Sequence, residues 1–357
     1  MNKTVYTLAA SAFLTIACFG QTPKSLFPLP APVVSTVPSN GDVNPYGVFF
    51  APNNVLSDGV LKPGDILVSN FNNVQNLQGT GTTIIRVDAH GAVSTFFQGK
   101  PGLGLTAALG VVRRGVVFVG NLPTADGTAA TVQPGSLLVL DRNGKLLGAL
   151  TDKKLVQGPW GMAVHDQGAT AQIFFSNVLN GTVTRLDVQF SNDGDSVGVQ
   201  GAYTIATGFN HRTDPAALVL GPSGVAYDAQ HDILYVASSA DNAVFAISDA
   251  GSRKDANEGT GKIIYQDNVH LHGPIDLVFT SAGHLITANS DGSNVDPNQP
   301  SELVEFTVNG QFINQFSVDK NNGGAFGVGI MQLSGASRIA AVDDNANTLS
   351  IWIEPIN

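Results

Sequence analysis

Apolar residues alternate with small or polar residues along short segments of this chain, and turns separate the segments. The stretch that begins at Pro222, PSGVAYDAQHDILYVASSADNAVFAIS, shows the pattern most clearly. Its runs GVAYD, ILYVAS and AVFAIS have the alternation that is typical of half-buried β-strands. The segments AQHD and SADN between them are rich in turn-forming residues. The stretch therefore predicts three consecutive strands whose apolar faces need further partners.

The same unit recurs along the chain. A Pro-x-Gly or Ala-x-Gly step precedes an apolar strand in five places, and Pro274-Ile275-Asp276 is a sixth copy with Asp in place of Gly. The third residues of these steps are separated by 51 to 63 residues, and they are Gly47, Gly110, Gly161, Gly224, Asp276 and Gly327. A spacing this regular predicts a repeat architecture.

Each copy continues through a second, a third and a fourth strand, except the sixth, because the chain ends at Asn357. An additional strand, PVVSTVPS, occupies residues 32–39. We expect it to complete the last sheet, since this closure removes an exposed strand edge. The sequence thus predicts an all-β fold, a six-bladed β-propeller of four-stranded antiparallel blades, with one domain over residues 21–357.

The first 20 residues have the features of an export signal. Lys3 supplies a positive start, and a run of apolar and small residues follows from Val5 to Ala17. This run is shorter than the ~20 residues that a membrane-spanning helix needs. We predict a signal peptide over residues 1–20, export to the periplasm or the cell exterior, and no membrane span. Lipid anchoring at Cys18 is the alternative, but Thr15 stands where lipid-modified sequences usually have leucine.

Composition excludes several classes of function. The net charge of −10 argues against nucleic acid or an anionic membrane surface as the main partner. Cys18 is the only cysteine, so a chain cleaved after residue 20 has no disulfide, no cysteine nucleophile and no thiolate metal ligand. We expect a monomer whose partner is a small molecule or a protein.

One polar residue ends the second strand of every unit. Four are asparagines, and the set is Asn70, Asn121, Asn177, Ser238, Asn289 and Asp343. In a propeller these positions form a ring in register, so their oxygens could bind a polar ligand or a hard cation. The alternative is that they bond to neighbouring backbone, as Asn and Asp often do at strand ends.

The repeat resembles the blades of NHL-repeat propellers and, more loosely, those of SMP-30/gluconolactonase-like and paraoxonase-like lactonases. The Pro222 stretch, PYGVFFAPN, PWGMAVHDQ and PIDLVFTSAGHLITAN carry the resemblance, which covers nearly the whole chain after residue 20. The resemblance implies a six-bladed propeller with its site at the mouth of the central channel. It says little about activity, because one fold supports many functions.

The middle residues of the six steps depart from the lactonase pattern. In SMP-30-like lactonases, Asn and Asp at comparable positions bind a metal ion, whereas this chain has Tyr46, Leu109, Trp160, Ser223, Ile275 and Phe326 there. This departure argues against a calcium- or zinc-dependent lactonase. We therefore expect no cofactor, and calcium enters only under the alternative of a hydrolase or lyase with an atypical metal site.

Three of these middle residues are aromatic. Tyr46, Trp160 and Phe326 could face the mouth of the channel and bind a carbohydrate or another amphipathic molecule. Ordinary packing between blades explains the same residues equally well.

The residues around the sixth step form the sharpest candidate for catalysis. His270 and His272 can place their rings on one face of an extended segment, with Asp276 close by. His272 and Asp276 are the candidate catalytic pair, for acid–base work or metal binding. The alternative is that the histidines lie in a surface loop without a catalytic role.

Long connections gather on one face. The segments 71–82, 122–134 and 290–300 join second to third strands, and 99–106 and 208–220 lead into first strands. Long loops are often functional, although surface loops also tolerate insertions that have no function. The favoured hypothesis is a secreted propeller that binds a partner or a small, carbohydrate-like ligand on this face without catalysis, and a purely structural module is a third option.

Overall fold

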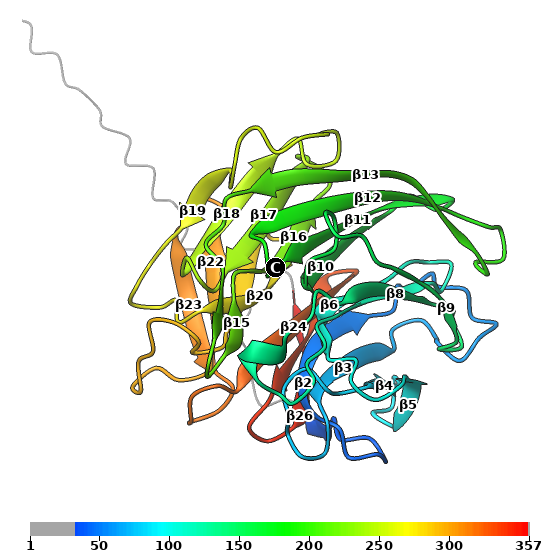
Figure 1. Cartoon of the computed structure of the whole chain (residues 1–357), viewed down its shortest axis with the longest axis horizontal. Coiled ribbons are helices and arrows are strands. Elements are labelled where there is room, and N and C mark those ends of the chain that lie inside the picture. The colour runs from blue at the N-terminus through cyan, green and yellow to red at the C-terminus, as the bar shows by residue number, and fades with distance from the viewer. Residues whose placement is uncertain (1–32, 356–357) are drawn as a thin grey trace, which may run out of the picture.

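The computed structural model describes residues 33–355 and shows six four-stranded antiparallel sheets arranged around one axis (Figure 1). The first three sheets are β2–β5, β6–β9 and β10–β13. Their strands are β2 (Val43–Phe50), β3 (Ile66–Asn72), β4 (Thr83–Val87), β5 (Val93–Gln98), β6 (Leu105–Val111), β7 (Val117–Asn121), β8 (Ser136–Leu140), β9 (Leu146–Leu150), β10 (Pro159–Asp166), β11 (Thr170–Asn177), β12 (Thr182–Phe190) and β13 (Val197–Thr207).

The other three sheets complete the ring. Their strands are β16 (Pro222–Asp228), β17 (Ile233–Ser238), β18 (Ala243–Ser248), β19 (Lys262–Tyr265), β20 (Pro274–Phe279), β21 (His284–Asn289), β22 (Glu302–Thr307), β23 (Phe312–Ser317), β24 (Ala325–Leu333), β25 (Ala336–Asp343), β26 (Thr348–Pro355) and β1 (Val33–Ser35). The N-terminal strand β1 pairs with β26 and so completes the sixth sheet. The predicted six-bladed propeller, including its closure, is confirmed.

Two details differ from the expectation. The closing strand is shorter than residues 32–39, because the chain turns at residues 39–40 to enter the first blade. A further hairpin, β14 (Arg212–Asp214) with β15 (Leu218–Leu220), lies in the loop that leads into the fourth blade. The short 3₁₀ helix η1 (Ala129–Thr131) lies in the long connection of the second blade. The predicted signal peptide, residues 1–20, lies outside the described residues.

The glycine of the Pro-x-Gly step is required where the inner strands of neighbouring blades meet. A Cβ at Gly224 would collide with the backbone of Asp276, and one at Gly327 would collide with the carbonyl of Tyr46. The inner strands therefore pack backbone against backbone around the axis. Larger side chains at these positions would push adjacent blades apart.

Serine hydroxyls bridge neighbouring blades beside these glycines. Ser69 accepts a hydrogen bond from Gly47 N (2.9 Å) and donates one to the carbonyl of Thr106 in the next blade (2.7 Å). Ser176 bridges Gly161 N and the carbonyl of Ser223 in the same way (3.0 and 2.5 Å). These bonds satisfy buried backbone groups that the irregular register of the inner strand leaves unpaired.

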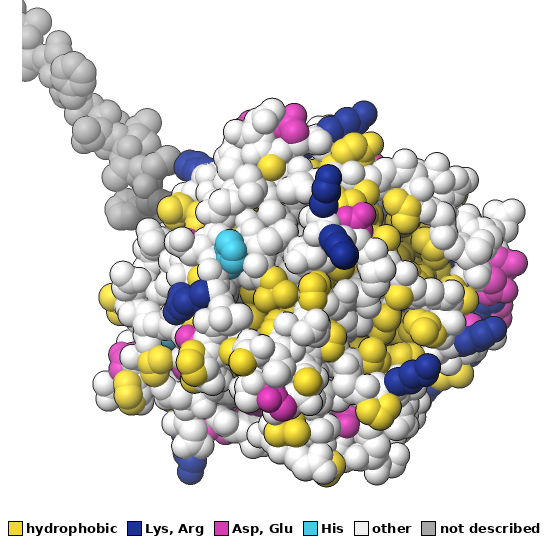
Figure 2. Space-filling view, viewed as in Figure 1, with side chains coloured by type: hydrophobic (Ala, Val, Ile, Leu, Met, Phe, Trp, Pro, Cys, Tyr) yellow, Lys and Arg dark blue, Asp and Glu magenta, His cyan; other side chains and the backbone are white. Residues whose placement is uncertain are grey.

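Apolar side chains fill the spaces between blades, and charged side chains are sparse on the surface. On the face shown in Figure 2, Lys and Arg side chains are scattered and form no large basic patch. No helix within residues 33–355 is long and apolar enough to cross a membrane.

Candidate functional site

The loops that lead into the first strands and those that join second to third strands form one face, here called the crown. The aromatic residues of the Pro-x-Gly steps meet under the centre of this face. Tyr46 packs on Phe326 (ring centroids 4.6 Å apart) and meets Trp160 edge-on (5.6 Å). Phe71 contacts both Tyr46 and Trp160 (4.8 and 5.5 Å).

Most of this aromatic cluster is buried. Tyr46 is 3% exposed and Trp160 is 1% exposed, whereas Phe326 is half-buried. Leu218 and Val219 of the hairpin belong to the same apolar cluster, and residues at and beside η1 pack against it. Figure 1 shows η1 and β15 in front of the inner strands. The rings thus pack between blades and offer no open face to a ligand at the axis.

The six polar residues at the ends of the second strands bond mainly to nearby chain. The amide of Asn177 donates to the carbonyl of Leu155 and to two threonines, and its oxygen accepts from Gln157 N. Asn121 exchanges two hydrogen bonds with Ser136, and Ser238 donates to Asp241. The remaining members donate to or accept from backbone: Asn70 to Thr36, Asn289 to His270, and Asp343 from Ala346.

The crown carries a polar pocket over the first and second blades, and we call it the crown pocket. Its volume is about 450 Å³, within the range of small-molecule sites. Three of the long connections noted in the sequence supply most of its lining. The lining residues with polar side chains are Asn40, Asp42, Asn73, Thr80, Thr82, Gln98 and Thr124.

Asp42 anchors the floor of the crown pocket. Its Oδ2 accepts hydrogen bonds from Thr82 N, the Thr82 hydroxyl and the Thr83 hydroxyl, at 2.7 to 2.9 Å. Within residues 33–355, its Oδ1 receives no hydrogen bond, and neither does the side chain of Gln98. The crown pocket therefore presents an acceptor and an amide with free hydrogen-bonding capacity.

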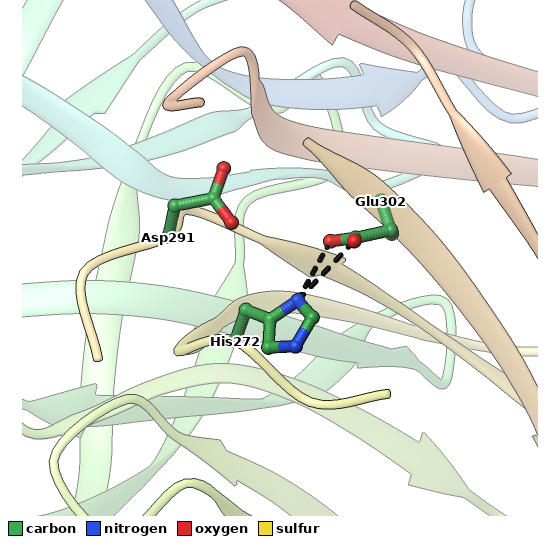
Figure 3. A group of neighbouring side chains, drawn as sticks. All are labelled: His272, Asp291 and Glu302. Carbon is green, nitrogen blue, oxygen red and sulfur yellow. Dashed lines mark hydrogen bonds and ion pairs between the residues drawn. The ribbon is translucent and has the colours of Figure 1, made fainter. Parts of the chain in front are cut away.

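The structure places His272 beside two carboxylates that the sequence analysis did not select. Figure 3 shows His272, Asp291 and Glu302 turned toward one another in the fifth blade. His272 Nδ1 lies 3.2 Å from each oxygen of Glu302. One ligand-type atom from each of the three residues lies within 4.8 Å of the others. We call this group the His272 cluster.

The pKa values of His272 and Asp291 are both raised. Burial lowers the pKa of His272, but the hydrogen bond and the negative charge of Glu302 outweigh it, so the pKa is raised. Burial raises the pKa of Asp291, and the charge of Glu302 raises it further, against two hydrogen bonds from Gly323 N and Ser301 N. The cluster therefore holds negative charge in a site that disfavours it.

His270 and Asp276 have other partners. His270 pairs with Asp267 and stacks on Phe312. Asp276 accepts hydrogen bonds from Leu277 N and, across the blade boundary, from Val328 N, both at 2.9 Å. Within residues 33–355, no hydrogen bond or ion pair joins His272 to Asp276. The two candidate catalytic residues thus do not form a pair.

Asp276 lines the central channel, a cavity of about 200 Å³ bounded by the inner strands of all six blades. Apart from Asp276, its lining consists mainly of apolar side chains such as Leu109, Met162 and Val225. Burial raises the pKa of Asp276 to about 7, and the two backbone hydrogen bonds only partly oppose this.

Asp291, Glu302 and Asp42 are the residues that the sequence analysis missed. A signal for Glu302 was present, since the apolar strand ELVEF contains two glutamates, and a buried glutamate needs a partner. Asp291 and Asp42 lie in loops, where an acidic residue is ordinary. Only the folded loops show that they are buried.

Comparison with known proteins supports the fold alone. No family model and no curated protein matches the sequence. Among solved structures, a calcium-binding protein, regucalcin, from Agrobacterium tumefaciens aligns over 93% of this chain and 97% of its own, with 14% identity and a TM-score of 0.54. A streptogramin B lyase aligns over 92% and 88%, with 14% identity and a TM-score of 0.48. A nidogen/laminin complex aligns over 77% and 96%, with 14% identity and a TM-score of 0.45.

The fold and the site define the class of this protein. It is a six-bladed β-propeller with the fold expected from the NHL and SMP-30-like resemblance. Its crown carries a polar pocket over the first two blades, and a buried His–Asp–Glu group lies in the fifth blade. Function has to be argued from these sites, because the fold does not specify it.

Proposed function

We propose that this protein binds a small, neutral polyhydroxy ligand of the carbohydrate class in the crown pocket, without turning it over. The observation that carries the proposal is the lining of the pocket, which combines amides, hydroxyls and a single carboxylate over about 450 Å³. Amides both donate and accept, and a carboxylate accepts from hydroxyl groups. These groups match a ligand that presents many hydroxyls.

The lining also argues against other ligands. It contains no Lys, Arg or His, so it offers no counter-charge to an anion. It contains no aromatic ring, so a flat apolar ligand has nothing to stack on. Hydrolysis of a glycosidic bond usually needs two carboxylates about 5 to 10 Å apart, and Asp42 is the only carboxylate in the lining. Binding without hydrolysis is therefore the function we propose.

The test uses Gln98, whose side chain is exposed and has no partner to lose within residues 33–355. A panel of mono- and oligosaccharides is titrated by calorimetry and by saturation-transfer NMR. We expect at least one sugar to bind, and Gln98→Ala to weaken it about 5- to 10-fold, the effect of losing one hydrogen bond. Gln200→Ala, an exposed glutamine on β13, is the matched control and should leave affinity unchanged.

Two results would overturn the proposal. One is the absence of binding across the panel. The other is binding that persists undiminished in both Gln98→Ala and Ala125→Arg, since a long side chain at exposed Ala125 would fill the crown pocket.

A further inference from the structure

The His272 cluster brings together three side chains from two connections and one strand of the fifth blade. His272 lies between β19 and β20, Asp291 follows β21, and Glu302 is the first residue of β22. Their exposed fractions are 1%, 8% and 0%. Imidazole and carboxylate are the side chains that bind zinc in proteins that lack cysteine ligands. The fold thus places three zinc-type ligands in one buried site.

The charges in this site do not balance. Two carboxylates face one imidazole, which carries at most one positive charge. No Lys or Arg within residues 33–355 forms an ion pair with Asp291 or Glu302. A buried carboxylate without a positive partner is costly. A bound cation would supply the missing positive charge.

Asp291 gives a second, independent indication. Its Oδ2 accepts from Ser301 N (2.9 Å) and Gly323 N (2.8 Å), whereas its Oδ1 is buried and has no hydrogen-bond partner within residues 33–355. Figure 3 shows a carboxylate oxygen of Asp291 directed toward the His272–Glu302 pair. An unpartnered buried oxygen loses the full free energy of its hydration. A metal ion between the three residues would satisfy it.

We propose that His272, Asp291 and Glu302 bind a zinc ion. The ion would lie between the three side chains and would replace the contact between His272 Nδ1 and the Glu302 carboxylate. One nitrogen and two carboxylates suit Zn²⁺ better than Ca²⁺, which takes six to eight oxygens. The site lies in the fifth blade, and the crown pocket lies over the first two. The proposed zinc site is therefore independent of the ligand proposed above for the crown pocket.

The first experiment measures metal content and affinity. The protein is purified without a metal column, stripped with a chelator and titrated with Zn²⁺, Mn²⁺ and Ca²⁺ by calorimetry. We expect one Zn²⁺ per chain, bound more tightly than the other two ions, and a rise in melting temperature on adding Zn²⁺. Failure to bind Zn²⁺ stoichiometrically would overturn the proposal, and tighter binding of Ca²⁺ would overturn the assignment to zinc.

The second experiment assigns the ligands. Asp291→Asn keeps an oxygen that can accept from Ser301 N and Gly323 N but removes the charge, so the loop retains its anchor. We expect Zn²⁺ affinity to fall at least 10-fold in this variant. His270→Asn, which removes a neighbouring histidine that pairs with Asp267 instead, is the control and should keep wild-type affinity. Cobalt substitution gives a direct readout, because its visible absorption should weaken in Asp291→Asn and not in His270→Asn. Unchanged affinity and absorption in Asp291→Asn would overturn the assignment.

Discussion

Asp276 shows how one substitution within a repeat changes the chemistry of the axis. Five blades have glycine at this position, whereas the fifth blade has Asp276. Its carboxylate accepts a hydrogen bond from the backbone N–H of Val328 in the sixth blade. The side chain thus ties two blades together where other blades use serine bridges. Its location in a mainly apolar channel raises its pKa from 3.8 to about 7.

This raised pKa makes stability depend on pH. In the unfolded chain the carboxyl loses its proton near pH 4, whereas in the folded chain it keeps the proton up to about pH 7. The unfolded state therefore binds fewer protons between these values, and stability falls as the pH rises through this window. A shift of about three pKa units corresponds to roughly 4 kcal/mol lost by pH 8.

We predict that Asp276→Asn flattens this dependence. At pH 5 the variant should be about 1–3 kcal/mol less stable than the wild type, because the Asn amide leaves one of two backbone N–H groups unpaired. At pH 8 this deficit should shrink or reverse, since the wild type then buries a charge. Urea unfolding from pH 5 to pH 8 measures both.

Exposed Asp255 offers the control for this pH series. Asp255→Asn removes the same charge from the surface and should give a small difference that is nearly constant with pH. A deficit of Asp276→Asn that stays constant across the series would contradict a pKa near 7 for Asp276.

At the same scale, sequence patterns locate residues but not their partners. His272 was selected from the sequence as a candidate, yet the two carboxylates beside it stand 19 and 30 positions further along the chain. Loop conformation, which no periodic pattern encodes, brings Asp291 to it. Tyr46 and Trp160 were expected to face the mouth of the channel, but the pattern could not show that their rings pack against each other and are buried.

At the scale of elements, the β14–β15 hairpin decides what the crown can do. It was not predicted, because three-residue strands carry too little alternation to register as a pattern. Leu218 and Val219 are buried against the aromatic cluster, so the hairpin covers the mouth that would otherwise be the obvious ligand site.

We predict that removing the hairpin exposes the aromatic cluster. Replacing residues 212–219 by a flexible Gly/Ser linker should lower the free energy of unfolding by about 2–5 kcal/mol, because two apolar side chains are no longer buried. In a Trp352→Phe background, the emission of Trp160 should shift to longer wavelength and become accessible to acrylamide. Replacing the turn 192–195 on the opposite face is the control and should leave Trp160 emission unchanged. Unaltered emission in the hairpin variant would show that the hairpin does not seal the mouth.

At the scale of the whole molecule, the repeat was enough to predict the ring. Six copies of one unit fix the number of blades, and the missing fourth strand of the sixth copy implies that another segment supplies it. This inference succeeds because the repeat is encoded locally in each unit. The sites could not be predicted in the same way, since the crown pocket and the His272 cluster depend on loops that differ between units.

Closure of the ring rests on β1, which joins the two ends of the propeller. Val33, Val34 and Ser35 pair with β26, and Thr36 bonds to Asn347 of the last blade and to Asn70 of the first. Without β1, strand β26 would present unpaired backbone groups, and such an edge is a template for association.

We predict that a chain beginning at residue 40 is less stable than a matched chain beginning at residue 31. The expected loss is about 2–5 kcal/mol, since several backbone hydrogen bonds worth about 1 kcal/mol each disappear. The shorter chain should also form oligomers in size-exclusion chromatography, because its β26 edge is free to pair with a second copy. Urea unfolding and elution volume are compared for the two chains. Equal stability and equal elution would mean that the ring stays closed without β1, through the contacts between the inner strands alone.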